Sequence, residues 1–515
     1  MCSQTYGRTE ALGPKIRLAY ILQGEETMPS SFFGLEIGYS ALASSQIALD
    51  VVSNNVSNIN TPGYARETVT FDETDPFTLP GLDSFSPGQL GTGTTITAIN
   101  EVRDQFLDRQ ILAANSDQSA YNTLQQVLGQ AQTAFSEPSS SGIGQQLTNF
   151  FNAFSNLAAN PEDPGIRATV VNQAVTLTNA FHNVSNSLSQ LLPNLNSRIQ
   201  MDVQQLNSIT TQIATLNHQI GVSIAAGQHP NDLIDKRSAL LSQLSGLVNL
   251  QIVDEVNPQT GQPNGEIDVH VGGFTLVQGD TAEPLSYTST SVGSANTLGL
   301  MDSQGNAIPL LGGEIYGLLK ASAMVQGYQS QLDTLAYNLI NAVNSIHQTG
   351  MGLDGSTSTL FFSSPPPPPG TGAAASISVN SAIIADPQKI AAASVPTPPN
   401  PLAPGNGDVA SQIANLANTA VIGGASLNDY YNALISTIGS DTQTAQSQAN
   451  NQQQIVSQLQ SQQQSVSGVN LDEELTNMLQ YQRTYQAAAR VINMADAFLD
   501  TIINGLGANS TPVAA

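Results

Sequence analysis

The sequence has no tryptophan, one cysteine and few charged residues. A disulfide needs two cysteines, so Cys2 cannot form one within the chain, nor can it supply a thiolate cluster for a metal ion. The sequence also lacks a run of 18 or more apolar residues. We therefore expect no insertion into a membrane, because a membrane-spanning helix needs about 20 such residues.

Charge is scarce and mostly of one sign. Asp, Glu, Lys and Arg make up 10% of the 515 residues, and the net charge is -25 with only 14 Lys and Arg. Soluble domains usually carry about 25% charged residues. Without a basic stripe to neutralise phosphates, nucleic acid is not expected as a partner. Ser, Thr, Asn and Gln replace charge at the surface, which suits a protein packed among copies of itself.

Motifs of catalysis and metal binding are missing as well. The histidines are scattered without HExxH spacing, and neither a GxxxxGK[ST] phosphate loop nor a GxSxG nucleophile elbow occurs. We therefore expect a protein that is not an enzyme and has no cofactor. A catalytic pair brought together from distant positions in the inserted regions stays an open alternative.

The chain starts with a segment unlike the rest. Residues 1–27 include a short apolar run, 18–22, which is too short for a secretory signal peptide. Helical patterning begins directly after Met28. We interpret Met28 as the biological start, which makes residues 1–27 a leader that is not translated.

Residues 28–64 predict an N-terminal helix with an apolar seam. Its seam positions are spaced by three or four residues, as in a coiled coil: Leu42, Ser45, Leu49, Val52, Val56 and Ile59. The helix should stop near Thr61, because Pro62 disfavours helical geometry in the residue before it and Gly63 favours a turn. Tyr64 then starts a new direction.

The middle of the chain alternates between helical and non-helical patterns. Residues 65–250 predict a helical bundle with a small β element and a long helix over 195–220. Residues 251–312 predict an inserted β domain, since Ile267, Val269 and Val271 alternate with polar residues. A helix over 313–350 returns to the bundle.

A second inserted region, 351–410, is rich in Pro and Gly, and we interpret its oligoproline run, 365–369, as a spacer or exposed loop. Helices return over 411–468, where a Gln-rich stretch keeps helical spacing.

Residues 469–506 predict a C-terminal helix, followed by a tail over 507–515. Asn470 is expected to cap this helix. Its seam positions are again three or four residues apart: Leu471, Leu475, Met478, Gln482, Tyr485, Ala489, Ile492, Asp496, Leu499 and Ile503. The predicted fold class is therefore α+β and multidomain, with a long helical bundle or coiled coil made from both chain ends and inserted, mainly-β outer domains.

Two kinds of segment carry a resemblance to a known family. SALASSQIALDVVSNNVSNINTPGYAR, residues 40–66, resembles the N-terminal signature of the bacterial flagellar axial proteins of the rod, the hook and the hook-associated group. PNDLIDKRSALLSQLSGLV, the segment 312–355 and GVNLDEELTNMLQYQRTYQAAARVINMADAFLDTII resemble the hook-associated protein 1 family. The likeness extends from 28 to about 506.

The resemblance implies a structural role at the hook-filament junction, where a ring of subunits joins the flexible hook to the rigid filament. It implies the hook protein and the second hook-associated junction protein as partners, and an export chaperone on the C-terminal helix. It also implies export through the flagellar type III system to an extracellular location. The alternatives are a hook or distal rod subunit, or a coiled-coil scaffold outside the flagellum.

The two terminal helices then form the expected assembly interface. Asn54, Asn55, Asn58 and Asn60 lie largely off the seam, where uncharged amides can hydrogen-bond to neighbouring subunits. Local capping and turning are sufficient to explain the turn itself.

Overall fold

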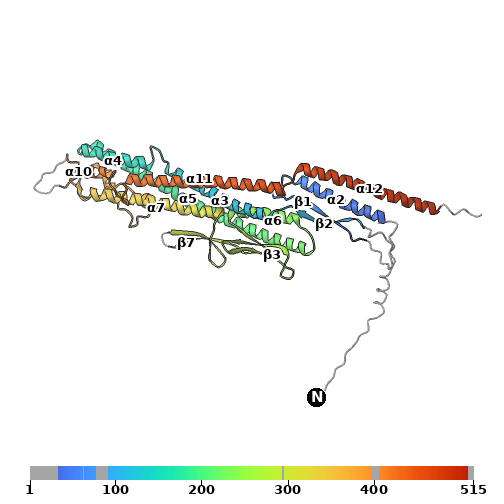
Figure 1. Cartoon of the computed structure of the whole chain (residues 1–515). Coiled ribbons are helices and arrows are strands. Elements are labelled where there is room, and N and C mark those ends of the chain that lie inside the picture. The colour runs from blue at the N-terminus through green and yellow to red at the C-terminus, as the bar shows by residue number, and fades with distance from the viewer. Residues whose placement is uncertain (1–32, 62, 77–90, 293–294, 396–404, 508–515) are drawn as a thin grey trace, which may run out of the picture. The chain divides into compact units, whose positions relative to one another are not determined.

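The computed structural model describes residues 33–61, 63–76, 91–292, 295–395 and 405–507 (Figure 1). The chain divides into two compact units, Met1–Arg103 with Val466–Ala515 and Asp104–Ser465. The expected α+β fold, with long helices from both chain ends and antiparallel sheets between them, is confirmed. The proposed leader and the last eight residues of the tail lie outside the described residues.

The first unit consists of two helices and a hairpin. Helix α2 spans Phe33–Ser57 and helix α12 spans Leu471–Gly507. Strands β1, Glu67–Glu73, and β2, Thr94–Glu101, pair antiparallel, with a bulge between Thr70 and Phe71. Asn470 caps α12 as expected, because its side-chain oxygen accepts a hydrogen bond from Asp472 N at 3.0 Å.

The second unit is a helical bundle. Its main helices are α3 (Gln105–Phe135), α4 (Ile143–Ala159), α5 (Pro164–Ala225), α6 (Asn231–Leu247), α7 (Gly313–His347), α10 (Asp408–Asn415) and α11 (Leu427–Ser467). Helices α3, α4, α5, α6, α7 and α10 pack against others of the set; α5, for example, contacts α4, α6 and α7. Helix α11 contributes Tyr431, Leu434 and Ile438 to the same buried core.

Helix α5 is 62 residues long and begins well before the predicted segment 195–220. Asp163 caps it by accepting hydrogen bonds from Gly165 N and Ile166 N. Pro193 lies inside it, at a position where proline costs about 3 kcal/mol. Leu188 and Leu195 on either side are buried in the core, and that packing holds the helix together.

Two sheets occupy the first inserted region. Strands β3 (Gln251–Val256), β4 (Pro263–Val271), β5 (Phe274–Gln278) and β6 (Thr281–Ala282) form one antiparallel sheet. Strands β7 (Ser286–Val292), β8 (Ala295–Met301) and β9 (Ala307–Ile308) form the other. The predicted alternation in β4 is confirmed, since Ile267, Val269 and Val271 are buried. Helix α5 covers this face of β4.

Buried polar side chains attach the first sheet to the bundle. Asn217 of α5 is fully buried, and its amide nitrogen donates to Ile267 O at 2.8 Å and to Gly279 O at 2.7 Å. Its oxygen accepts from Arg237 Nη1 of α6 at 2.9 Å. The sheet is therefore fixed by directional bonds as well as by apolar packing.

The segment 351–395 contributes to the core on both sides of its oligoproline run. Phe361 and Phe362 are fully buried against Phe150 and Phe154 of α4. The oligoproline run itself, 365–369, is half-buried to exposed. Short elements surround it: β10 (Gly350–Met351), α8 (Ala373–Ser376), α9 (Ser381–Ala385), η1 (Pro387–Lys389) and β11 (Ala393–Ser394). The domain boundaries given above stay predictions.

Three buried side chains on helices hold this segment in place. The amide of Asn344 bonds both backbone groups of Phe362, donating to its oxygen at 3.0 Å and accepting from its nitrogen at 2.9 Å. Arg167 donates to Ile390 O at 2.8 Å. His347 Nε2 accepts from Ala391 N at 2.9 Å, so its proton lies on Nδ1, which donates to Thr359 O at 2.7 Å.

Helix α11 is joined to α3 by a ladder of side-chain amides. Gln118 Nε2 donates to Gln453 Oε1 at 2.8 Å, Gln125 Nε2 donates to Gln446 Oε1, and Gln463 Nε2 donates to Asp108. The spacings of 10 and 7 residues are equal on both helices, so the pair is antiparallel in one constant register.

His347 makes the stability of the second unit depend on pH. Burial lowers the pKa of its ring from 6.5 to about 4. His347 therefore contributes on the order of 3 kcal/mol to the free energy of unfolding. This contribution is complete above pH 6.5 and is lost as the pH falls toward 4. We expect the melting temperature of the wild type to fall more steeply over this range than that of His347→Asn.

The matched control is His218→Asn, because the ring of His218 is 64% exposed. It should keep the wild-type slope of melting temperature against pH. Parallel slopes for all three proteins in calorimetry would contradict the role assigned to His347.

Candidate assembly interface

Helices α2 and α12 lie side by side and run antiparallel (Figure 1). Gly38 near the start of α2 faces Ile492, and Asn55 near its end reaches Glu474. A Cβ atom added to Gly38 would lie 3.0 Å from Ile492 Cγ1, so glycine permits the close approach of the two helices here. The two predicted seams therefore meet within one chain.

The inner face of α12 differs from the predicted seam at every second position. Met478, Tyr485, Ile492 and Leu499 are half-buried as part of it. The intervening positions are each one residue earlier than expected, namely Glu474, Tyr481, Ala488 and Ala495. Leu471, Leu475 and Ile503 are instead 44%, 44% and 67% exposed, which corrects their placement in the seam of the single chain.

A polar bond explains this difference. Glu474 is buried because its carboxylate accepts from the amide of Asn55 at 3.2 Å, so it takes the position that the sequence pattern gave to Leu475. Tyr481 is drawn inward by Phe71 of β1, with ring centroids 6.0 Å apart. An apolar count along the sequence cannot detect either preference.

Helix α2 buries two of its faces. On the predicted seam, Ser45 and Val52 are buried, while Leu42, Leu49 and Val56 are half-buried. A second face packs on the hairpin, where Ser44 Oγ donates to Thr94 O at 3.2 Å.

The turn after α2 lies beyond the predicted seam. The helix ends at Ser57, which leaves Ile59 40% exposed in the turn that follows. Asn60 and Gly63 are exposed and Tyr64 is half-buried, whereas Pro62 lies outside the described residues.

Asn55 is the central polar side chain of this unit. It is 1% exposed, and its amide nitrogen donates to Glu67 O at 2.9 Å and to Glu474 Oε2. Its oxygen accepts from Glu67 N at 2.9 Å and from Tyr64 Oη at 2.8 Å. Both donors and both acceptor positions of the amide are used. Asn55 thus joins α2, β1 and α12.

The asparagine cluster is therefore mainly internal. Our expectation that these amides face neighbouring subunits is wrong for Asn55, which has no bonding capacity left. Asn54 Nδ2 donates to Glu67 Oε2 at 3.2 Å, and Asn58 Nδ2 donates to Asn54 Oδ1 at 2.9 Å. Thr61 Oγ1 donates to Asn58 Oδ1 at 3.1 Å. Asn60 is the exposed member of the four.

Charges gather where the hairpin meets the start of α12. Burial raises the pKa of the Glu474 carboxyl, and the hydrogen bond from Asn55 and the charge of Arg66 oppose this rise. Arg66 Nη1 lies 2.8 Å from Glu473 Oε1. The acidic start of α12 is therefore balanced by one arginine and by the helix dipole.

The outer face of α12 exposes apolar side chains. In addition to the three leucine and isoleucine residues above, Leu479, Val491, Met494 and Phe498 are 57%, 38%, 65% and 62% exposed. Met494, Phe498 and the exposed Ile502 are each four residues apart, so they follow one side of the helix. We call Met494, Phe498 and Ile502, the last of them 36% exposed, the outer stripe; Val491 lies beside Gly38 of α2 and is not part of it. Large contiguous patches of exposed apolar surface are typical of protein interaction sites.

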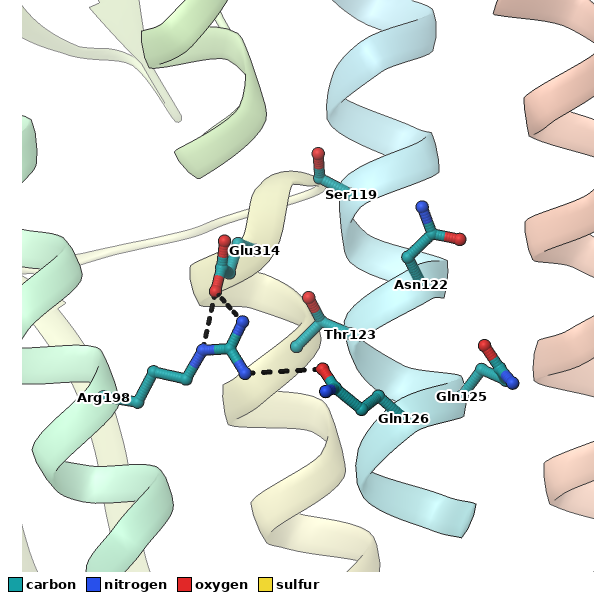
Figure 2. Close-up of a pocket in the computed structure, with 7 residues that line it drawn as sticks. All are labelled: Ser119, Asn122, Thr123, Gln125, Gln126, Arg198 and Glu314. Atoms are coloured by element: carbon teal, nitrogen blue, oxygen red, sulfur yellow. Dashed lines mark hydrogen bonds and ion pairs between the residues drawn. The ribbon is translucent and has the colours of Figure 1, made fainter. Parts of the chain in front are cut away.

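The second unit has a polar hollow of about 450 Å³ between α3, α5 and α7 (Figure 2). Arg198 Nε donates to Glu314 Oε1 at 2.7 Å, and Arg198 Nη1 donates to Gln126 Oε1 at 3.4 Å. The two charged residues that line the hollow, Arg198 and Glu314, are therefore bonded to each other. The other lining residues are uncharged and polar: Ser119, Asn122, Thr123 and Gln125. None of the residues that line this hollow is a histidine or a cysteine. The arrangement ties α5 to α7 and α3.

Among the residues that the structure describes, no cluster of three or more His, Cys, Asp or Glu side chains could hold a metal ion. Of the helices in that part of the chain, none combines the length and the apolar character needed to cross a membrane.

Family models match three parts of the chain. Residues 128–362 match the flagellar hook-associated protein FlgK helical domain, residues 460–505 the flagellar basal body rod FlgEFG protein C-terminal family, and residues 35–64 the flagella basal body rod protein family. The two rod-type matches cover most of α2 and most of α12.

Whole-chain relatives agree with these matches. Flagellar hook-associated protein 1 of Bacillus subtilis is 30% identical over 93% of this chain and 99% of its own length. That of Salmonella typhimurium is 29% identical over 90% and 98%. The flagellar hook junction protein FlgK from Burkholderia pseudomallei has a similar fold, with a TM-score of 0.61 and 20% identity over 70% of this chain and 100% of that one.

Replacing Asn55 tests its role in joining the three elements. Asn55→Asp removes both donated bonds and places a carboxylate beside Glu474, so it should destabilise the first unit by about 1 to 3 kcal/mol for each buried group left unpaired. Hydrogen exchange of the α2 amides should become faster. Adding Glu474→Gln should restore part of the protection, because a glutamine can donate to the new carboxylate.

Asn60→Asp introduces the same charge at an exposed position of the same turn and serves as the control. Equal exchange rates for Asn55→Asp and Asn60→Asp would rule out the joining role.

Proposed function

Because the chain belongs to the flagellar hook-associated protein 1 family and is a structural protein of the hook-filament junction, we propose that it enters the junction through its α2-α12 helix pair. Copies assemble into an axial ring in which these pairs lie side by side. The observation that carries the proposal is the outer stripe of α12, which is exposed in the part of the chain that the structure describes. Each such side chain contributes about 1.5 to 3 kcal/mol when a neighbouring copy buries it.

The division of the helix faces supports this role. The inner face of α12 is used within the chain, through Asn55, Gly38 and the half-buried seam residues. The seam residues Leu42, Leu49, Val52, Met478, Tyr485 and Leu499 therefore shape the pair. Neighbouring copies contact each other through the outer stripe, through the exposed Leu471, Leu475 and Ile503, and through Asn60.

We propose that the ring contacts the hook protein on one side and the second hook-associated junction protein on the other. Before export, a chaperone covers the outer stripe, since it would otherwise expose apolar surface in the cytoplasm. The flagellar type III system then exports the chain to the outside of the cell. Its role is structural, and a net charge of -25 makes nucleic acid an unsuitable partner.

A hook or distal rod subunit is the nearest alternative. The matches of 35–64 and 460–505 to rod families are compatible with either reading. The match of 128–362 to the FlgK helical domain and the relatives aligned over nine-tenths of the chain decide for the hook-associated family. They also set aside a coiled-coil scaffold outside the flagellum.

Deleting the gene tests the junction role. Cells should carry bare hooks without filaments and should release flagellin into the medium, as seen by electron microscopy and immunoblotting. Filaments of normal length on the deletion strain would refute the role. Restoring the gene should restore filaments.

Point variants test the two faces of α12. Leu49→Asp or Leu499→Asp should break the helix pair and block incorporation into junctions while the second unit stays folded. Met494→Ser with Phe498→Ser should block incorporation but leave the pair intact, because these side chains point away from α2.

Leu311→Ser is the control for loss of an exposed apolar side chain, since Leu311 is 75% exposed in the second unit. It should incorporate normally. If the outer-stripe variant also incorporates at the wild-type level on isolated hooks, the assignment of that face is wrong.

A further inference from the structure

The exposed residues of α11 after Asp441 are all uncharged, and apart from Ile455 and Val466 they are all polar. After Asp441, the helix has no Asp, Glu, Lys or Arg up to its end at Ser467. The exposed residues spaced three or four apart along it are Ser447, Asn451, Gln454, Gln458, Ser461 and Ser465. We call these six residues the α11 amide face. The opposite side of the helix is buried through Ala445, Ala449 and Val456.

A second face of the same kind lies on α5. Between Arg167 and Arg198 this helix has no charged residue. Its outward positions, again three or four residues apart, are exposed: Asn172, Thr176, Asn179, Asn183, Ser187, Gln190, Asn194 and Ser197. We call this set the α5 amide face. Ala174, Phe181 and Leu188 on the other side of α5 belong to the core.

Solvent-facing sides of helices usually carry Glu and Lys, which favour the helix and keep the protein soluble. Ser and Asn are weaker helix formers, at a cost of about 0.5 kcal/mol per residue relative to Ala. Solubility therefore does not explain why two long helix faces consist of weak helix formers and have no charged residue. Close packing against another protein surface supplies an explanation, because burying an unpaired charge is far more costly than burying a paired amide.

The chain already shows how such faces pair. Gln118 donates to Gln453 and Gln125 to Gln446 across the α3-α11 boundary, in one constant antiparallel register. Amide groups both donate and accept, so one amide face complements another without any match of charge. The α11 and α5 amide faces have the same chemistry and are exposed.

The net charge of the chain indicates that a second copy is the partner of these faces. Two copies of a chain with a net charge of -25 repel each other wherever their charged surfaces meet. Charge-free faces are the places where identical copies approach at least cost. A ring also needs two different contact faces on each subunit, one for each neighbour.

We propose that the α11 amide face of one copy packs against the α5 amide face of the next copy around the ring. This contact rests on the proposed junction function and adds to it a lateral interface in the second unit, separate from the terminal helices. Side-chain amides from the two helices interleave and hydrogen-bond across the boundary between copies.

The experiment measures binding of purified full-length protein to hooks isolated from the deletion strain. Gln454→Glu with Gln458→Glu charges the α11 face, and Asn183→Asp with Gln190→Glu charges the α5 face. Each pair should lower the number of bound copies per hook by about tenfold, because a charge facing a copy of like net charge opposes close contact. Gln259→Glu with Gln262→Glu, in an exposed turn, is the charge-matched control and should bind normally.

A charge swap then identifies the two faces as partners. Gln454→Lys with Gln458→Lys, combined in one chain with Asn183→Asp and Gln190→Glu, should restore binding to within about twofold of the wild type. The same lysines combined with the turn glutamates should not. Restored binding also shows that the altered chains are folded.

Normal binding by the glutamate variants of either face, or equal rescue by the turn glutamates, would overturn the lateral contact while the junction role stands. Failure of the wild-type chain to bind hooks would overturn the junction role and the lateral contact together. The two failures are distinguished within the same experiment.

Discussion

The fold depends on one recurring interaction, in which a side-chain amide on a helix pairs with the backbone of an extended segment. Asn55 pairs with both backbone groups of Glu67, Asn344 with those of Phe362, and Asn207 with those of Leu285 at 2.8 Å for each bond. In each case the amide takes the place of a neighbouring strand. A helical protein can thereby carry long inserted segments whose polar backbone groups are satisfied without a sheet partner.

The same interaction explains which features could be predicted from the sequence. Periodicity and turn residues are sufficient to predict the terminal helices, the alternation in β4 and a bundle made from both chain ends. They are not sufficient for Glu474, which enters the α2-α12 boundary because Asn55 lies opposite it 419 residues away in sequence. Nor could they show that Phe361 and Phe362, near a run of prolines, reach the core beside α4.

Helix α12 has apolar side chains on the face toward α2 and also outside that face. Met478, Tyr485, Ile492 and Leu499 are half-buried, while Leu475, Met494 and Phe498 are exposed. The seam predicted from the sequence includes Leu471, Leu475 and Ile503 of the exposed set but neither Met494 nor Phe498. Only the contacts at Gly38 and Asn55 separate the face that folds the subunit from the face left for other molecules.

The amide ladder between α3 and α11 has a consequence for the conditions in which the protein works. The groups that pair at Gln118–Gln453 and Gln125–Gln446 neither titrate nor carry a net charge. Dissolved ions screen attraction between charges over about 10 Å at 0.1 M salt, but an amide pair offers them no charge to screen. Unlike an ion pair, these two amide pairs are therefore unaffected by a change from fresh water to brine or from acidic to alkaline surroundings.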